Sequence, residues 1–288
     1  VRIQLAAAAR VADHHREVMQ WEVEDIYRVL NAAGIPVIVL KGAAYAMAGL
    51  EAASGRMFGD VDILVPHGAI SEVEKELGHA GWIQDSRNAY DDRYYRKWMH
   101  EIPARRHIQR GTVLDVHHNI LPLTARNKPK VSALWHAAVP LPGFTDLYTL
   151  APSDMLLHSA SHLFLNGEFE RGLRDLNDFR RLARQFSGTP GFWSELQARA
   201  QMQDLAKPLA YAVRYANRLL AAGFPEACTA VLSKPAMPAL DRLFTQGLLP
   251  RHSSVHNAWT PVALFALYVR GHYLRMPLHL LLPHLIYN

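Results

Sequence analysis

Two short runs rich in apolar β-branched residues most constrain how this chain can fold. They cover residues 35–40 and 60–65, and the first of them carries no carboxylate or cationic side chain before its end. Such runs are typical of strands that are buried on both faces, as in sheets covered by helices. Residues 11–33 place apolar side chains at helical spacing, and Gly34 and Pro36 end that helix. The sequence therefore predicts an α/β unit at the N-terminus.

The other elements follow from the same patterns. The buried face of the first helix is expected to consist of Val11, Val18, Ile26, Val29, Leu30 and Ala33. Helices are predicted over 43–50 and 69–79. Two or three antiparallel strands are predicted between 82 and 120, the clearest over 112–117. The rest of the chain is predicted to be helical, with helices over 153–165, 170–186, 192–206 and 208–222 and more toward the C-terminus. We therefore predict an α+β fold, with a mixed-sheet domain over 1–150 and an all-helical domain over 151–288.

Composition narrows the class of protein. Half of the residues (50%) are apolar and 20% are charged, so the chain can build a core and is not disordered. The net charge of +5 suits anionic ligands such as nucleotides but is too small for a protein that wraps DNA. Cys228 is the single cysteine, which excludes a disulfide framework and a thiolate zinc site. The sequence has neither a long uncharged apolar run nor a signal-peptide pattern, so we expect a cytoplasmic protein with no membrane partner.

Asp60 and Asp62 are the most informative polar residues. They are two apart on a predicted strand, so both side chains leave the same face, while Val61 and Ile63 point the other way. Two carboxylates that close repel each other unless a cation lies between them. Mg²⁺ is the natural candidate because it prefers hard oxygen ligands and often contacts substrate phosphates. The alternative is a surface strand that begins with two solvated acids.

A third acid lies on the strand predicted over 112–117. Asp115 shares one face of that strand with Val113 and His117. If the strand lies beside the one that carries Asp60, three carboxylates meet, which suits a two-metal site for phosphoryl chemistry. An ordinary edge-strand acid is the alternative. His117 and His118 are either supporting groups or exposed, and His100 and Glu101 are further candidates for the site.

Lys41 and Gly42 follow the first buried strand, at the end where α/β sheets place their ligands. Glycine there allows close backbone approach, and the next helix offers free N–H groups to a phosphate. Arg56 lies four residues before Asp60 and adds a positive charge. A bare strand-to-helix turn is the alternative explanation for this pair.

Together these motifs resemble a known family. Leu40-Lys-Gly, then Arg56-x-x-Gly-Asp-x-Asp-Ile-Leu-Val65, then a later strand with Asp115 are similar to nucleotidyltransferases of the DNA polymerase β superfamily, and more narrowly to a bacterial family of uncharacterised nucleotidyltransferases. The resemblance covers roughly residues 25–120. It implies a small mixed sheet flanked by helices and followed by a helical domain. It also implies two Mg²⁺ ions, ATP or another nucleoside triphosphate (NTP) as donor, and transfer of the nucleotidyl group to a hydroxyl acceptor with release of pyrophosphate.

By this resemblance Asp60, Asp62 and Asp115 are the metal-binding and catalytic acids. Lys41, Gly42 and Arg56 would bind the donor and neutralise the leaving pyrophosphate. The superfamily usually has Gly-Ser or Gly-Gly at the strand-to-helix turn, whereas Gly42 is followed here by Ala43. A non-catalytic nucleotide-binding or regulatory protein with the same fold is therefore one alternative. The acceptor, a small molecule, a protein or an RNA end, stays open.

Five further patterns have a functional interpretation, a structural interpretation or both. His158 and His162 share a helix face and would serve a metal-dependent phosphohydrolase, or else line an interface. Ser153 and Asp154 are predicted to cap that helix. Arg174, Asp175 and Asp178 either reach a cleft or form ion pairs on a solvated helix face. The arginines and aromatics of 87–110 either bind nucleic acid or, as we favour, form a basic face over an aromatic core, and residues 277–287 are expected to form a packing helix.

Overall fold

The structure is a computed structural model that describes residues 2–84, 95–232, 237–250, 252 and 254–279. The chain forms two compact units. The first unit combines Val1–Leu123 with Lys130–Ala151, and the second combines Thr124–Pro129 with Pro152–Asn288. None of the helices within the described ranges is both long enough and apolar enough to cross a membrane.

The first unit is built on one mixed sheet, whose described strands are seven in number. The strands are β1 (Val37–Val39), β2 (Asp60–Leu64), β3 (Trp82–Gln84), β4 (Arg105–His107), β5 (Val113–His117), β6 (Val139–Pro140) and β7 (Leu147–Thr149), in the order β3-β4-β5-β2-β1-β7-β6. Strand β2 is antiparallel to β1 and parallel to β5, and β1 is parallel to β7. The sheet and the helical second unit confirm the predicted α+β class.

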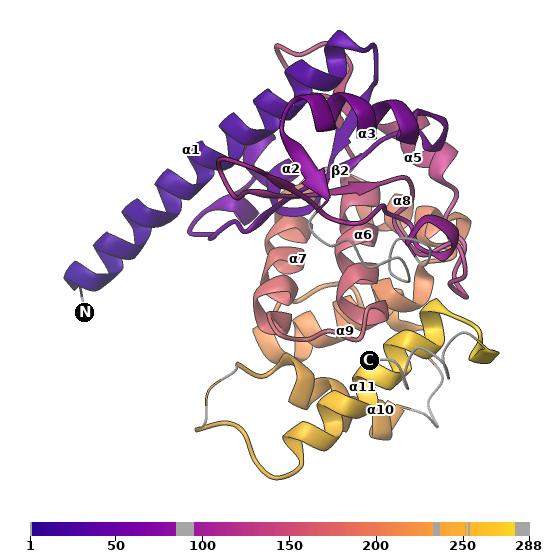
Figure 1. The fold of residues 1–288 in the computed structure, drawn as a ribbon. Coiled ribbons are helices and arrows are strands. Elements are labelled where there is room, and N and C mark those ends of the chain that lie inside the picture. The colour runs from indigo at the N-terminus through magenta and orange to yellow at the C-terminus, as the bar shows by residue number, and fades with distance from the viewer. Residues whose placement is uncertain (1, 85–94, 233–236, 251, 253, 280–288) are drawn as a thin grey trace. The chain divides into compact units, whose positions relative to one another are not determined.

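Helices cover this sheet (Figure 1). They are α1 (Arg2–Ala32), α2 (Lys41–Met47), α3 (Ile70–His79) and α5 (Val131–Ala137), with short 3-10 turns η1 (Glu51–Ala53) and η2 (His67–Ala69). Helix α1 buries Met19, Val23, Ile26 and Leu30, which recur every three or four residues. The predicted face was partly wrong, since Val11 and Val18 are 47% and 44% exposed. The buried stripe runs one residue further along the helix, through Ala12 and Met19.

The second unit is helical throughout its described part. Its elements are α6 (Pro152–Leu165), α7 (Gly172–Phe186), α8 (Phe192–Met202), α9 (Ala206–Leu220), η3 (Glu226–Thr229), α10 (Met237–Leu248) and α11 (Thr260–Arg275). Aromatic rings fill its interior, where Phe244 lies 5.1 Å from Phe164 and 5.4 Å from Tyr215 between ring centroids. Helix α11 approaches the chain after α6 closely, because a Cβ on Gly271 would lie 2.5 Å from the carbonyl oxygen of Asn166. Glycine at this position permits that contact.

Polar residues fix the beginning of α6 in a way that the sequence did not predict. Ser153 lies inside α6 and its hydroxyl donates to Glu195 at 2.9 Å, so it is not the helix cap. Asp154 is almost fully buried and accepts two hydrogen bonds from Arg199, at 2.7 and 2.6 Å. Helix α6 is therefore tied to α8 by a buried ion pair. The predicted C-terminal packing helix falls largely on residues outside the described ranges.

Candidate functional site

The candidate site lies where β1 ends beside the beginning of β2. The amide of Leu40 donates to the carbonyl of Asp62 at 2.9 Å, which continues the β1–β2 pairing and brings Lys41 beside this strand. Asp62 is aligned with Asp115 in the parallel β2–β5 pair. Side chains of aligned residues in neighbouring strands leave the same face of the sheet, so these two carboxylates are neighbours. Asp60 shares the face by alternation but stands at the exposed beginning of β2.

Asp62 is only 3% exposed and is held by two nitrogen groups. Its Oδ1 lies 2.7 Å from Nζ of Lys41 and 3.0 Å from Nε2 of His117. Burial would raise the pKa of Asp62, but the charge of Lys41 and the hydrogen bond from His117 hold it well below its usual range. In the same way burial would lower the pKa of Lys41, and Asp62 instead raises it. Asp62 is therefore ionised and Lys41 protonated at neutral pH.

Asp115 behaves in the opposite way. Burial, together with the negative charges of Asp62 and Glu101, raises the pKa of Asp115 to about 7. Lys41 and His117 lower it by less. A second buried carboxylate beside Asp62 is therefore disfavoured in its ionised form, and this is the environment that favours a bound cation or a shared proton.

Gly42 is packed directly against Arg56. A Cβ at position 42 would lie 2.8 Å from Nε of Arg56 and 3.1 Å from Nη2, so a larger residue would displace the guanidinium. The guanidinium lies 5.7 Å from the ring centroid of Tyr45 and 5.9 Å from that of Phe58. Aromatic faces attract cations at this range. The glycine and the two rings therefore place a positive charge beside the strand-to-helix turn.

The turn itself is strained at Lys41. Its φ is +47°, in the left-handed region that residues with a side chain rarely adopt. Helix α2 begins at Lys41, two residues earlier than predicted. The unusual backbone directs the lysine into its contact with Asp62, and backbone strain of this kind is commonly kept where function requires it.

The histidines at the end of β5 are buried, so the interpretation that they are exposed was wrong. Nδ1 of His117 lies 3.1 Å from Oε2 of Glu101, while its Nε2 faces Asp62. Burial opposes protonation of His117, but Glu101 and Asp62 raise its pKa. His118 packs its ring 4.6 Å from that of His67, and burial and the charge of His67 lower its pKa to about 4. His117 is therefore part of the acid cluster, and His118 is a neutral packing residue.

His158 and His162 lie on α6 in the second unit, with ring centroids 6.5 Å apart. In the described part of the chain, the group of three side chains that could share a metal ion is formed by His100, Glu101 and His117. Neither histidine of α6 belongs to it. Arg174 donates to Asp175 at 2.6 Å, but Asp178 is buried, so the three residues do not share a solvated helix face.

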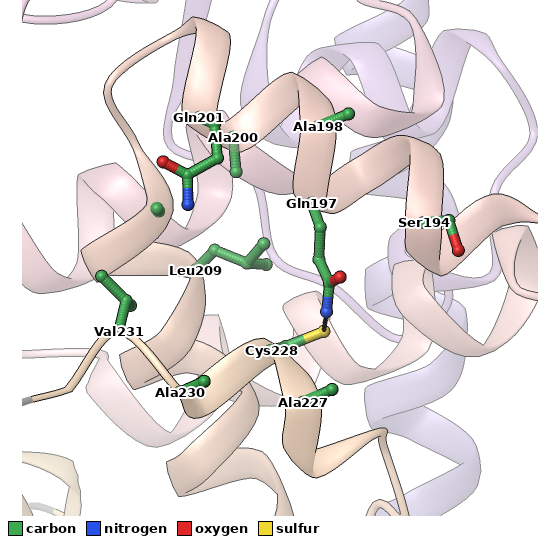
Figure 2. Close-up of a pocket in the computed structure, with 11 residues that line it drawn as sticks. Ser194, Gln197, Ala198, Ala200, Gln201, Leu209, Ala227, Cys228, Ala230 and Val231 are labelled. Carbon is green, nitrogen blue, oxygen red and sulfur yellow. Dashed lines mark hydrogen bonds between the residues drawn. The ribbon is translucent and has the colours of Figure 1, made fainter.

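The second unit contains a cavity of about 350 Å³ between α8, α9 and η3 (Figure 2). Nε2 of Gln197 lies 3.0 Å from Sγ of Cys228 at its wall. The described side chains that line it are small or uncharged, among them Ala198, Leu209 and Val231. Burial raises the pKa of the Cys228 thiol. A cavity of this composition lacks the cations that a triphosphate requires, so the polar cluster of the first unit remains the candidate site.

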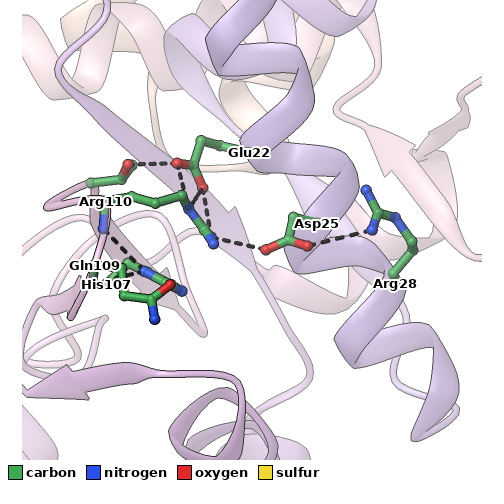
Figure 3. Close-up of polar contacts among 7 residues, drawn as sticks. Glu22, Asp25, Arg28, His107, Gln109 and Arg110 are labelled. Carbon is green, nitrogen blue, oxygen red and sulfur yellow. Dashed lines mark hydrogen bonds and ion pairs between the residues drawn. The ribbon is translucent and has the colours of Figure 1, made fainter.

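Three of the arginines between 95 and 110 form ion pairs: Arg96, Arg105 and Arg110. Arg110 contacts both oxygens of Glu22 and, at 2.8 Å, Oδ2 of Asp25, which ties the β4–β5 turn to α1 (Figure 3). Arg96 and Arg105 both bind Glu74. These contacts give the three arginines a structural role, but Arg105 is buried, so it does not belong to the basic solvent face that we favoured for this region. The arginines and tyrosines of 85–94 lie outside the described residues.

Comparisons with known proteins give one match. A family model described as an uncharacterised nucleotidyltransferase matches residues 1–221, which spans the first unit and the second as far as the end of α9. Neither the curated proteins nor the solved structures include a match to the chain. The matched residues include every predicted site residue and make up well over half of the chain, so the chain belongs to the uncharacterised nucleotidyltransferase family.

Proposed function

We propose that this protein transfers a nucleotidyl group from an NTP to a hydroxyl acceptor in a Mg²⁺-dependent reaction that releases pyrophosphate. The observation that carries the proposal is the aligned pair of Asp62 and Asp115 on one face of the sheet, with Lys41 in contact with Asp62. Membership of a nucleotidyltransferase family supports the reaction class.

The donor set fits Mg²⁺. Asp60, Asp62 and Asp115 offer hard carboxylate oxygens from two neighbouring strands, which is the ligand type that Mg²⁺ prefers. Burial and the nearby charges of Asp62 and Glu101 raise the pKa of Asp115 to about 7, and a bound divalent cation would favour its ionised form. Bound Mg²⁺ supplies charge neutralisation on the triphosphate and polarises the attacking hydroxyl.

The residues of the chain then have separate tasks. Asp60 and Asp62 hold the metal, and His117 and Lys41 fix the orientation of the Asp62 carboxylate. Asp115 is aligned with Asp62 on the same face of the sheet, so its carboxylate can accept the proton of the acceptor hydroxyl. Catalysis would come mostly from positioning and electrostatics, as is general for phosphoryl chemistry.

The donor phosphates are assigned to the turn after β1. Lys41 and the guanidinium of Arg56 place two cations next to Gly42, whose lack of a side chain makes room for that guanidinium. Arginine and lysine are the usual partners of phosphate oxygens. These groups would stabilise the charge that develops on the leaving pyrophosphate.

The test is to incubate the protein with Mg²⁺ and each of the four NTPs and to measure the release of pyrophosphate. NTPs labelled at the α-phosphate follow the transferred nucleotidyl group. Asp62→Asn and Asp115→Asn should each lower the rate by about a hundredfold or more, since each removes a charge that acts at the transition state. Asp13→Asn is the matched control, because Asp13 is exposed on α1 and pairs only with Arg16 three residues on. Release of pyrophosphate that survives Asp62→Asn, or release of inorganic phosphate instead, would contradict the proposal.

A second candidate is a non-catalytic nucleotide-binding protein. One observation favours it: Oδ1 of Asp62 already contacts both Lys41 and His117, and Ala43, which is buried, has no hydroxyl for a phosphate. Calorimetry with Mg²⁺–NTP separates the two candidates. Saturable binding without pyrophosphate from any NTP, with every acceptor class supplied, would favour the binding protein.

A further inference from the structure

Three side chains with metal-binding atoms, those of His100, Glu101 and His117, lie close together beside Asp62 and Asp115, which we call the acid pair. Oε2 of Glu101 lies 3.1 Å from Nδ1 of His117 and 3.9 Å from Nε2 of His100. The candidate ligand atoms of the three residues all lie within 4.8 Å of one another. Both histidines are buried and Glu101 is half-buried. Two imidazoles and a carboxylate at this separation need only a small contraction to reach one ion.

Backbone pairing holds these residues in place before any ion binds. Glu101 forms a β-bridge with His117, the amide of His118 donates to the carbonyl of His100 at 2.8 Å, and the amide of Ile102 donates to the carbonyl of Val116 at 3.0 Å. The ligands therefore come from two hydrogen-bonded segments rather than from a loose loop. A site of this kind does not have to be ordered by the metal.

The hydrogen bond to Asp62 sets the tautomer of His117. Nε2 of His117 lies 3.0 Å from Oδ1 of Asp62, and because a carboxylate oxygen accepts, this nitrogen carries the hydrogen. The lone pair of Nδ1 is then directed toward Glu101. Histidines that bind transition metals in proteins usually donate their other ring N–H to a carboxylate. The carboxylate orients the imidazole and raises its basicity.

We propose that His100, Glu101 and His117 form a second metal site, for a divalent transition metal of the Zn²⁺ type, linked to the acid pair through Asp62. Two imidazole nitrogens and one carboxylate suit Zn²⁺ or Co²⁺, whereas Mg²⁺ prefers oxygen ligands throughout. Three protein ligands leave a coordination position open for water or a ligand oxygen. The proposal does not rest on nucleotide transfer, because it concerns metal binding by the free protein.

The experiment uses the full-length protein without a histidine tag, stripped with a chelator and then titrated with Co²⁺ while visible d–d absorption is recorded. One equivalent should bind, and Zn²⁺ should displace it, with the stoichiometry checked by elemental analysis. His100→Gln and Glu101→Gln should each weaken Co²⁺ binding by at least about tenfold, and Asp62→Asn by about ten- to a hundredfold through the orientation of His117.

Two further variants locate the ion. His136→Gln, which changes an exposed histidine on α5 that contacts the carbonyl of Ser132, is the control and should bind Co²⁺ as the wild type does. Asp60→Asn changes the proposed Mg²⁺ site and should weaken Co²⁺ binding by less than Glu101→Gln does. Unfolding midpoints close to the wild-type value show that the variants fold. No bound Co²⁺ in the wild type, or binding that Asp60→Asn abolishes and Glu101→Gln leaves intact, would overturn the site. Retained Co²⁺ binding with no pyrophosphate release would refute only the transferase proposal.

Discussion

Asp62 is the residue at which the polar interactions of the sheet meet. It is buried, it is bonded to the strained Lys41 on one side and to His117 on the other, and it is aligned with Asp115. A buried charge with good partners contributes little net stability, but it becomes costly when one partner is removed. Substitutions around Asp62 should therefore show strong coupling.

The first prediction concerns this coupling. Lys41→Met should lower the free energy of unfolding by about 2 kcal/mol, because it leaves the carboxylate of Asp62 with one partner fewer in a buried position. Asp62→Asn should cost a similar amount. The double variant should cost clearly less than the sum, and urea unfolding of the four proteins measures the difference. Simple additivity would show that the ion pair contributes nothing to folding.

The second prediction concerns Gly42. Gly42→Ala should push the guanidinium of Arg56 away, since the new Cβ would lie 2.8 Å from Nε, and should raise the KM for NTP several-fold. In the background of Arg56→Ala the same glycine substitution should have little further effect. Gly78→Ala on α3 is the control, because no atom lies within 4 Å of its added Cβ, and alanine there should be neutral or slightly stabilising. An equal effect of Gly42→Ala in both backgrounds would exclude Arg56 as the cause.

Among the secondary-structure elements, strands with a clear run of β-branched residues were predicted from the sequence, and strands without such a run were missed. The buried β1 and β2 were found because several β-branched residues follow one another, but β6 and β7 have two and three residues and carry no such signal. Alternation put Asp115 and His117 on one face, whereas the alignment of Asp115 with Asp62 depends on long-range pairing. The approach of Glu101 to His117 and of Arg56 to Gly42 arises in the same way, from tertiary contacts that local spacing does not encode. The roles of these residues stay predictions.

The third prediction tests the connection between α9 and α10. Asp241 accepts hydrogen bonds from Arg214 at 2.6 Å and from the hydroxyl of Tyr215 at 2.7 Å, and the bond from Arg214 lowers its pKa. A carboxylate whose pKa is lower in the folded state stabilises the fold above its unfolded pKa and loses that effect as the pH falls through the folded value. Asp241→Asn should therefore cost about 1 kcal/mol at pH 7, and the difference from wild type should shrink below about pH 4. Urea unfolding across this pH range measures it, and a pH-independent difference would contradict the assignment.

At the scale of the whole molecule, the family match and the folded core do not end at the same place. The match stops at residue 221, yet α10 and α11 contribute to the interior of the second unit. Phe244 of α10 contacts the rings of Phe164, Tyr211 and Tyr215, all of which lie inside the matched region. Residues after 221 therefore contribute a side chain to the core that the matched part forms.

The last prediction follows from this arrangement. Phe244 is fully buried, and Phe244→Ala should lower the free energy of unfolding by about 3–5 kcal/mol, as large-to-small changes in aromatic cores do. Phe265→Ala on α11 is the matched control, because Phe265 is 66% exposed and its truncation should cost little. A fragment that ends at residue 221 should aggregate on expression, since it exposes Phe164 and Tyr215 to water. A soluble fragment of that length with a cooperative unfolding transition would show that α10 and α11 are additions to a core that closes without them.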